Sequence, residues 1–291
     1  MLAEVRIDAI LQRGQPVFSF EFFPPKTPAA AEQLLRTIDE LRSIAPAFVS
    51  VTYGAMGSNR GQVIDLVARI RNEIGLNPMA HLSCTGHSRS EIAAILDQLA
   101  AAGVDNVLAL RGDPPKGESF VSAPDGFAHA SDLTAFIRSG WPSICVGGAC
   151  YPEKHPDAPD AATDLAHLVR KVEAGADFLI TQLFFDDTDY FAFVERAREA
   201  GIRVPILPGI MPITDVGGVR RMTAMCGAGI PAALESSLAA ADGDPTRVLA
   251  VGVEHATSQC RELLARGVPG VHFYTLNKSP ATRRIVTALS F

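Results

Sequence analysis

A glutamate interrupts an otherwise apolar stretch near the start of the chain. Residues 16–25 read PVFSFEFFPP, and the aromatic and β-branched residues before Glu21 favour a β-strand. The Pro24-Pro25 pair ends that strand, because proline cannot donate to a sheet ladder. Burial disfavours a charged carboxylate, so we expect a raised pKa for Glu21, which suits a general acid near neutral pH. The alternative is a strand-end glutamate paired with an arginine.

Other polar side chains follow or end further apolar runs. They are Thr52, Tyr53, His81, Arg111, Asp113, Tyr151, His155, Gln182, Tyr274 and Lys278. Each has a plain structural alternative: a core histidine, an Arg111–Asp113 ion pair, a buried amide, a packing tyrosine or a solvated lysine. Six strand ends with polar groups are nevertheless hard to explain by stability alone, and an α/β barrel builds its site where its strands end.

The residue types narrow the chemistry. The 7 histidines are scattered, so no zinc ligand set is predicted. No lysine lies within an apolar strand run, which argues against a Schiff-base enzyme. A carboxylic acid, a second carboxylate held by arginine, a glutamine and aromatic faces remain. These suit acid catalysis on a flat, nitrogen-rich substrate, with an organic cofactor.

Eight short apolar runs alternate with segments of helical period, which predicts an α/β fold of the (β/α)8 barrel type. The runs are residues 17–22, 48–53, 79–84, 106–110, 143–149, 178–183, 206–210 and 271–275. The intervening helices are residues 30–41, 63–74, 90–102, 132–139, 160–174, 187–200 and 216–226, with Ser90 as a candidate N-cap.

The remaining segments complete a single domain over residues 1–291. The N-terminus is mildly amphipathic and is assigned to a helix, and residues 231–267 to a short helix followed by the eighth barrel helix, before the last strand. A doubly wound open sheet is the alternative fold. It is disfavoured because neither Gly-x-Gly-x-x-Gly nor a Walker loop is present.

Composition excludes several classes of protein. The chain has 291 residues, 47% of them hydrophobic and 20% charged, which allows a large core. A net charge of -6 argues against nucleic acid as a partner. The 5 cysteines lack a C-x-x-C pattern, so we expect a reduced, cytoplasmic protein. No apolar run is long enough to predict a membrane span.

Several motifs together resemble the methylenetetrahydrofolate reductases of the short bacterial type. They are Phe20-Glu-Phe-Phe-Pro-Pro25, Ser50-Val-Thr-Tyr-Gly-Ala55, Ala109-Leu-Arg-Gly-Asp-Pro114, Tyr151-Pro-Glu-x-His155, Thr181-Gln182 and Phe273-Tyr-Thr-Leu-Asn277. The resemblance implies a (β/α)8 barrel without a regulatory domain. It also implies FAD as cofactor, NADH or NADPH as hydride donor, and ping-pong reduction of 5,10-methylenetetrahydrofolate to 5-methyltetrahydrofolate.

The resemblance also assigns roles by position. Glu21 matches the general acid at N10 of the folate, and Asp113 the carboxylate that binds the pterin and stabilises its positive charge. Gln182, Tyr274 and Lys278 match substrate-binding positions. The cofactor-binding positions are Thr52, Tyr53, His81, Arg111, Gly112, Asp113, His129, Ala130, Tyr151, His155, Asp164, Arg170 and Lys171. Two departures stand out: Lys278 replaces an arginine, and Gly217-Gly218 replace bulkier residues that include a folate-binding glutamine.

Other functions stay open at this point. A flavin-free reductase with direct hydride transfer and a cofactor-free barrel lyase would both use Glu21 as an acid. A non-catalytic folate-binding protein would not need an acid. The sequence does not distinguish NADH from NADPH, and it leaves open a homo-oligomer.

Overall fold

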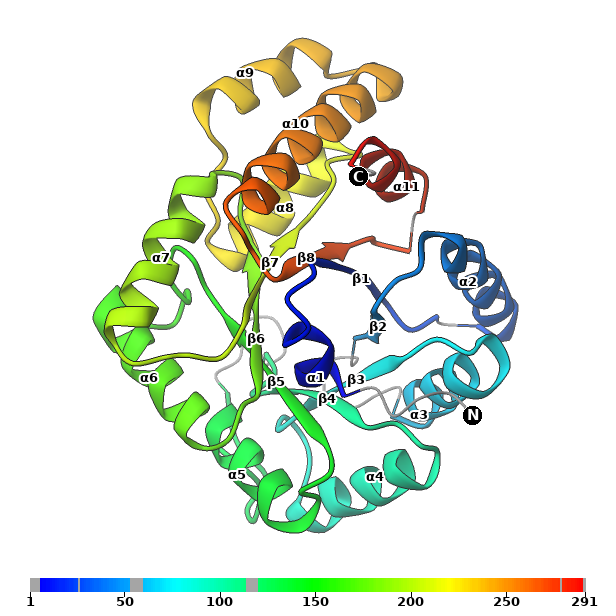
Figure 1. The fold of residues 1–291 in the computed structure, drawn as a ribbon, viewed down its shortest axis with the longest axis vertical. Coiled ribbons are helices and arrows are strands. Elements are labelled where there is room, and N and C mark those ends of the chain that lie inside the picture. Colours follow the sequence, from blue (N-terminus) through cyan, green and yellow to red (C-terminus); the bar gives the residue numbers. More distant parts are fainter. Residues whose placement is uncertain (1–5, 26, 53–59, 114–119, 278, 290–291) are drawn as a thin grey trace.

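Eight parallel strands close into a barrel surrounded by helices (Figure 1). The computed structural model describes residues 6–25, 27–52, 60–113, 120–277 and 279–289. Each strand pairs with the next, and β1 pairs with β8 to close the barrel. The strands are β1 (Val17–Phe22), β2 (Phe48–Val51), β3 (Pro78–Ser83), β4 (Asn106–Leu110), β5 (Cys145–Cys150), β6 (Phe178–Leu183), β7 (Ile206–Ile210) and β8 (Gly270–Tyr274). The predicted (β/α)8 barrel is therefore confirmed.

The helices form the outer ring, apart from α1 (Ile7–Leu11), which lies across the centre of the barrel in Figure 1. The others are α2 (Pro28–Leu41), α3 (Arg60–Arg69), α4 (Arg89–Ala101), α5 (Ala130–Gly140), α6 (Ala161–Glu173), α7 (Asp187–Glu199), α8 (Val216–Cys226), α9 (Ala232–Ala241), α10 (Pro245–Ala265) and α11 (Ser279–Ala288). A 3₁₀ turn, η1 (Arg42–Ile44), follows α2, and a π-helical turn, η3 (Ile70–Ile74), follows α3. Within the described residues, no helix combines the length and apolar character that a membrane span requires.

The predicted boundaries are close, because apolar runs and caps mark them clearly. The cap of α4 is an exception, since Ser88 and not Ser90 is the N-cap. Its side chain accepts from Glu91 N at 3.2 Å, while the Glu91 carboxylate accepts from Ser88 N at 3.0 Å. This reciprocal pair satisfies two backbone donors, so the helix begins one residue earlier than predicted.

The segment between β7 and β8 holds three helices, α8, α9 and α10. The predicted short helix and longer helix correspond to α9 and α10. The prediction that this segment contains the eighth barrel helix is wrong, because α11 follows β8 and takes that position. The inner faces of α8 and α9 pack on residues that follow β6 and β7, among them Phe185, Met211 and Ile213. The extra helices thus have a small apolar core of their own beside the barrel.

The barrel interior changes character along its axis. Its lower part is a dry core sealed by α1, formed by Ile7, Leu11, Phe48, Met79, Leu108, Cys145, Phe178, Ile180 and Leu207. Nearer the C-terminal ends of the strands, inward side chains are polar and still buried: Ser19, Glu21, Ser50, His81 and His272. Apolar packing stabilises the lower part, whereas each buried polar group above it needs a partner.

Charged side chains at the lower end are paired with arginine. Asp177 accepts from Arg138, from Arg6 at 3.5 Å and from Val146 N at 2.8 Å. Arg6 also holds Asp8 in two hydrogen bonds of 3.0 Å. These pairs fix α1 across the bottom of the barrel.

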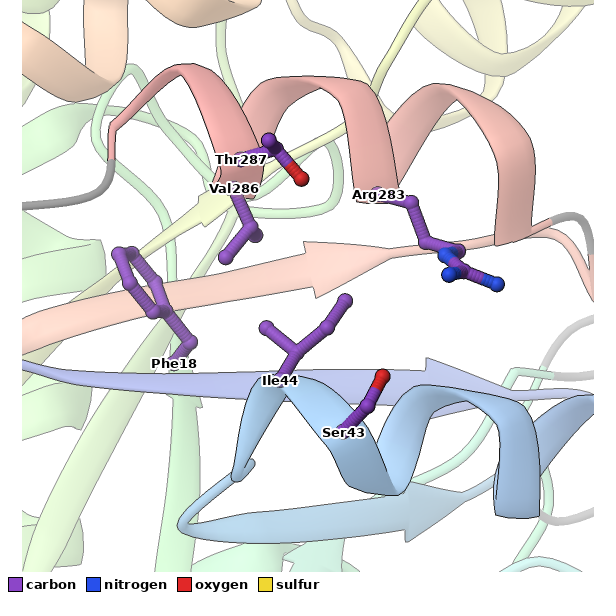
Figure 2. Close-up of a pocket in the computed structure, with 6 residues that line it drawn as sticks. All are labelled: Phe18, Ser43, Ile44, Arg283, Val286 and Thr287. Carbon is purple, nitrogen blue, oxygen red and sulfur yellow. The ribbon is translucent and has the colours of Figure 1, made fainter.

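A groove of about 350 Å³ lies on the flank of the barrel, away from the strand ends (Figure 2). Phe18, Ile44 and Val286 turn toward one another inside it, between β1, η1 and α11. Ser43, Arg283 and Thr287 complete its rim. None of the predicted site residues lines this groove.

Candidate active site

Glu21 is the centre of the polar part of the barrel. Only 8% of the residue is exposed, and its Oε2 atom lies 3.3 Å from His81 Nε2 and 3.4 Å from His272 Nε2. The Ser50 hydroxyl reaches the same oxygen at 3.5 Å. Strands β1, β2, β3 and β8 thus converge on one carboxylate oxygen. Hydrogen bonds within the described residues leave Oε1 available to a ligand.

The prediction of a raised pKa for Glu21 is wrong. Burial does raise it, but His81 and His272 together lower it more, and the resulting pKa is about 2. The carboxylate is therefore ionised at neutral pH. Sequence reasoning considered burial and an arginine partner, and it did not foresee two imidazoles facing the same oxygen.

The backbone around Glu21 is held by the end of β8. Thr275 donates to Glu21 O from its amide at 3.3 Å and from its hydroxyl at 2.6 Å. Asn277 accepts from Phe23 N at 2.8 Å and donates to Phe23 O at 3.0 Å, as another strand would. Through these hydrogen bonds, the Thr-x-Asn sequence after β8 fixes the backbone position of Glu21.

Tyr274 crosses over β7 to reach β6. Its hydroxyl donates to Thr181 O at 2.5 Å, and burial raises its pKa well above the usual value. The ring passes directly over Gly209, where an added Cβ would lie 2.6 Å from the ring and 2.4 Å from Thr181 O. Gly209 is thus required by this close approach and not by a special backbone angle.

The turn after β4 is pinned to the turn after β3. The Arg111 carbonyl accepts from the Thr85 hydroxyl at 3.0 Å, and Gly112 has φ +82 with no room for a Cβ beside Ser83. The suggested Arg111–Asp113 pair is wrong. Arg111 instead pairs with Asp157 at 2.7 Å, and Asp113 is exposed.

The loop after β5 supplies two aromatic rings. Tyr151 and His155 meet edge to face at 4.6 Å, and His155 Nδ1 accepts from Asp157 N at 3.0 Å. His155 N in turn donates to Asp164 Oδ2 at 3.0 Å, which ties this loop to α6. Burial and the nearby Arg111 lower the pKa of His155, so its ring is neutral at pH 7.

The two predicted basic residues of α6 differ in setting. Arg170 is exposed, whereas Lys171 runs along Gly148 and donates to Ala149 O at 2.6 Å. Burial lowers the pKa of Lys171. Of these two residues, Arg170 is the one exposed at the surface.

The remaining predicted residues are spread around the same end of the barrel. Thr52 continues β2 and donates its amide to Phe22 O at 2.9 Å. Gln182 is partly buried on β6, and its Oε1 accepts from Leu183 N at 2.9 Å. His129 and Ala130 begin α5. Tyr53 and Lys278 lie outside the described residues.

Sequence reasoning missed His272, Ser19 and Ser50. The available signal was the alternation of a strand: Ser19 and Glu21 share one face of β1, and His272 and Tyr274 share one face of β8. Register pairs Ser19 with His272 and Glu21 with Tyr274. Two polar residues at that spacing on neighbouring strands predict a shared buried network.

The fold and this site place the protein among the (β/α)8 barrels that have a buried acid at the C-terminal ends of their strands. The family model described as methylenetetrahydrofolate reductase matches residues 6–290. The chain belongs to the methylenetetrahydrofolate reductase family.

Individual relatives agree with this membership. The chain is 42% identical over 285 residues to methylenetetrahydrofolate reductase (NADH) 1 of Arabidopsis thaliana, covering 94% of this chain and 48% of that protein. It is 36% identical over 277 residues to 5,10-methylenetetrahydrofolate reductase of Escherichia coli, covering 95% and 92%. The chain thus spans about half the length of the plant relatives and most of the bacterial one.

A solved structure shows the same fold at low sequence identity. It is an uncharacterised protein from Clostridium thermocellum that binds two copies of 5-methyl-5,6,7,8-tetrahydrofolic acid. The two structures match with a TM-score of 0.63 and 13% identity, covering 97% of each chain.

Proposed function

We propose that this protein reduces 5,10-methylenetetrahydrofolate to 5-methyltetrahydrofolate with NADH or NADPH, using FAD in a ping-pong cycle. One observation carries the proposal: in a chain of this family, a buried glutamate faces two histidines at the C-terminal ends of the strands. Enzymes with a (β/α)8 barrel have their active sites at this end. The E. coli relative of matching length is named for the same folate.

The residues present fit FAD. His81 Nε2 is buried, and within the described residues its 3.3 Å contact with Glu21 Oε2 lacks hydrogen-bond geometry, so a ligand could satisfy it. Tyr151 and His155 offer flat walls, and Arg111 and Arg170 offer basic donors for phosphates. We propose Thr52, Tyr53, Gly112, Asp113, His129, Ala130, Asp164 and Lys171 as the other cofactor-binding residues. When bound, FAD would carry hydride from the nicotinamide to the folate.

Five side chains would bind or react with the folate. Glu21 protonates N10, because an amine leaving group must be protonated when its C–N bond breaks. Asp113 stabilises the positive charge that then develops on the pterin. Gln182 holds the pterin edge, with Tyr274 and Lys278 as further contacts. Because Glu21 is ionised at neutral pH, another group must supply its proton.

The visible spectrum of the purified protein, with added FAD, tests the proposal most directly. We expect flavin absorption that NADH or NADPH bleaches without oxygen and that 5,10-methylenetetrahydrofolate restores, with 5-methyltetrahydrofolate as product. A colourless protein that still makes this product would indicate a flavin-free reductase. A colourless protein with no folate reduction would favour the lyase alternative.

Asp113→Asn separates the two half-reactions. The variant should bleach with NADH but restore its absorption more slowly with folate, because the developing positive charge loses its counter-charge. Asp65→Asn, which changes an exposed carboxylate on α3, is the matched control. Equal folate rates in both variants would contradict the role of Asp113.

A further inference from the structure

His272 lies behind Glu21 and is completely buried, with 0% exposure. Its Nε2 is 3.4 Å from Glu21 Oε2, and its Nδ1 is 2.8 Å from Ser19 Oγ. Building on the proposed function, we propose that His272 stores the proton that Glu21 delivers to the folate, and that Ser19 stabilises His272 with and without that proton. His272 acts through Glu21 and is therefore a positioning residue.

The partner on Nδ1 decides whether a buried histidine can change its charge. A serine hydroxyl is both a donor and an acceptor, and it rotates to suit its partner. Because His272 gives up the proton on Nε2, Nδ1 keeps its hydrogen in both charge states, and Ser19 Oγ can accept from Nδ1–H in both. Nδ1–H is therefore satisfied before and after the transfer, so neither state incurs a penalty on that side of the ring. A carboxylate or an arginine in place of Ser19 would have favoured one charge state.

The ring is closed off from water on its other sides. Phe48 stacks on it at 5.8 Å with an interplanar angle of 16°, and Tyr274 meets it edge-on at 5.4 Å. Gly209 on β7 is its register neighbour. A proton on Nε2 therefore has one route outward, through the Glu21 carboxylate.

The titratable groups around this store come from three strands. Glu21 is on β1, His81 is on β3 and Tyr274 is on β8 beside His272 itself. Strand β2 contributes Phe48 and Ser50, which carry no charge. Within the described residues, no arginine or lysine pairs with any member of this group, so its charge can follow its protons.

The proton balance is simple. Charged His272 gives its Nε2 proton to Glu21, and protonated Glu21 gives a proton to N10 as the N10–methylene bond breaks, with the electron pair remaining on N10. Glu21 is left ionised and His272 neutral. One proton from solvent then enters through Glu21 and recharges His272 after the product leaves. One proton is consumed per turnover, as the proposed reduction requires.

His272→Gln tests the store, with His255→Gln as the control for loss of a partly buried histidine on α10. We expect the folate half-reaction of His272→Gln to fall roughly tenfold or more at pH 8. The limb where the rate falls with rising pH should move to lower pH, because one of the sites holding the proton is gone. Reduction by NADH should be unchanged. A wild-type pH profile in His272→Gln would overturn the proposal.

A second measurement needs no activity and guards against a variant that does not fold. In wild-type protein labelled with ¹⁵N-histidine, the ring-nitrogen resonances of His272 report which of its two nitrogens carry a proton. Glu21→Gln and Ser19→Ala should each change these resonances at pH 7, because each variant removes a partner of one ring nitrogen. If neither variant changes them, the store is refuted. Absence of folate reduction in the wild type would instead refute the proposed function.

Discussion

The two ends of this barrel hold carboxylates with different partners, one partly buried and one buried. At the end covered by α1, Asp177 is surrounded by Arg138, Arg6 and a backbone amide. At the opposite end, Glu21 is surrounded by His81, His272 and Ser50. Both sets lower the energy of a charged carboxylate in a poorly solvated place.

The partners differ in whether they can give up a proton. Arginine stays charged at every accessible pH, so Asp177 sits in a permanent ion pair that only holds structure. Histidine changes charge near neutral pH, so the charge around Glu21 can be rearranged during a reaction. The comparison teaches that the type of cation, more than burial, separates a structural acid from a chemical one in this molecule.

Glu21→Gln should give the largest effect and would break the comparison if it did not. The folate half-reaction should fall about 100- to 10,000-fold, because the amide has no proton to give. Bleaching by NADH should persist. Stopped-flow absorbance of each half-reaction measures this, and normal folate turnover would remove Glu21 from the mechanism.

Asp177→Asn should show the reverse pattern. We expect a loss of about 2–4 kcal/mol in the free energy of unfolding, because Arg138 and Arg6 keep their charges without a counter-charge. Folate and NADH rates per folded molecule should be unchanged. Urea denaturation is the measurement. Asp39→Asn breaks an exposed 3.4 Å pair with Arg42 and should cost less than about 0.5 kcal/mol.

Gly209→Ala tests whether the upper end depends on packing as well as charge. A Cβ at this position would clash with the Thr181 carbonyl and the Tyr274 ring, so we expect a loss of about 1–3 kcal/mol in the free energy of unfolding and a raised KM for the folate. Gly217→Ala is the control, because its nearest neighbour is the movable Arg221 side chain at 3.3 Å. Equal stability of the two variants would contradict the close approach of Thr181 and Tyr274 to Gly209.

Asp187 sharpens the comparison, because its partner is a neutral amide. Burial raises its pKa to about 7, although the Gln259 amide donates to it at 3.1 Å. The folded state keeps this proton from about pH 4 to pH 7 while the unfolded chain releases it, so stability falls as pH rises through that window. Asp187→Asn should remove on the order of 1 kcal/mol of this pH dependence. Thermal denaturation at pH 5 and pH 8 measures it, and unchanged slopes would be inconsistent with the raised pKa.

The barrel was largely predictable from sequence because its strands are short apolar runs with clear ends. The predicted bounds of β1 (Val17–Phe22), β4 (Asn106–Leu110), β6 (Phe178–Leu183) and β7 (Ile206–Ile210) agree with the structure. The order of strands alone then predicts which ends gather, so Glu21, His81 and Tyr274 could be placed at one end of the barrel. The resemblance of several short motifs to methylenetetrahydrofolate reductases predicted the family.

Partner choice was harder to predict, because it depends on side-chain reach across distant segments. Arg111 is 46 residues from Asp157, and sequence proximity pointed to Asp113 instead. Glu21 is 251 residues from His272, and only the register of β1 with β8 brings them together. The sign of the Glu21 pKa shift depended on that register, so burial alone gave the wrong direction.

The passage of Tyr274 above Gly209 has a consequence for how such a protein can diversify. At Gly209, β7 contributes only main-chain atoms to the site, because the Tyr274 side chain from β8 occupies the space above it. New substrate contacts must therefore arise on other strands or on the extra helices that follow. A related protein with a larger residue at position 209 would have to lose the hydrogen bond from Tyr274 to Thr181.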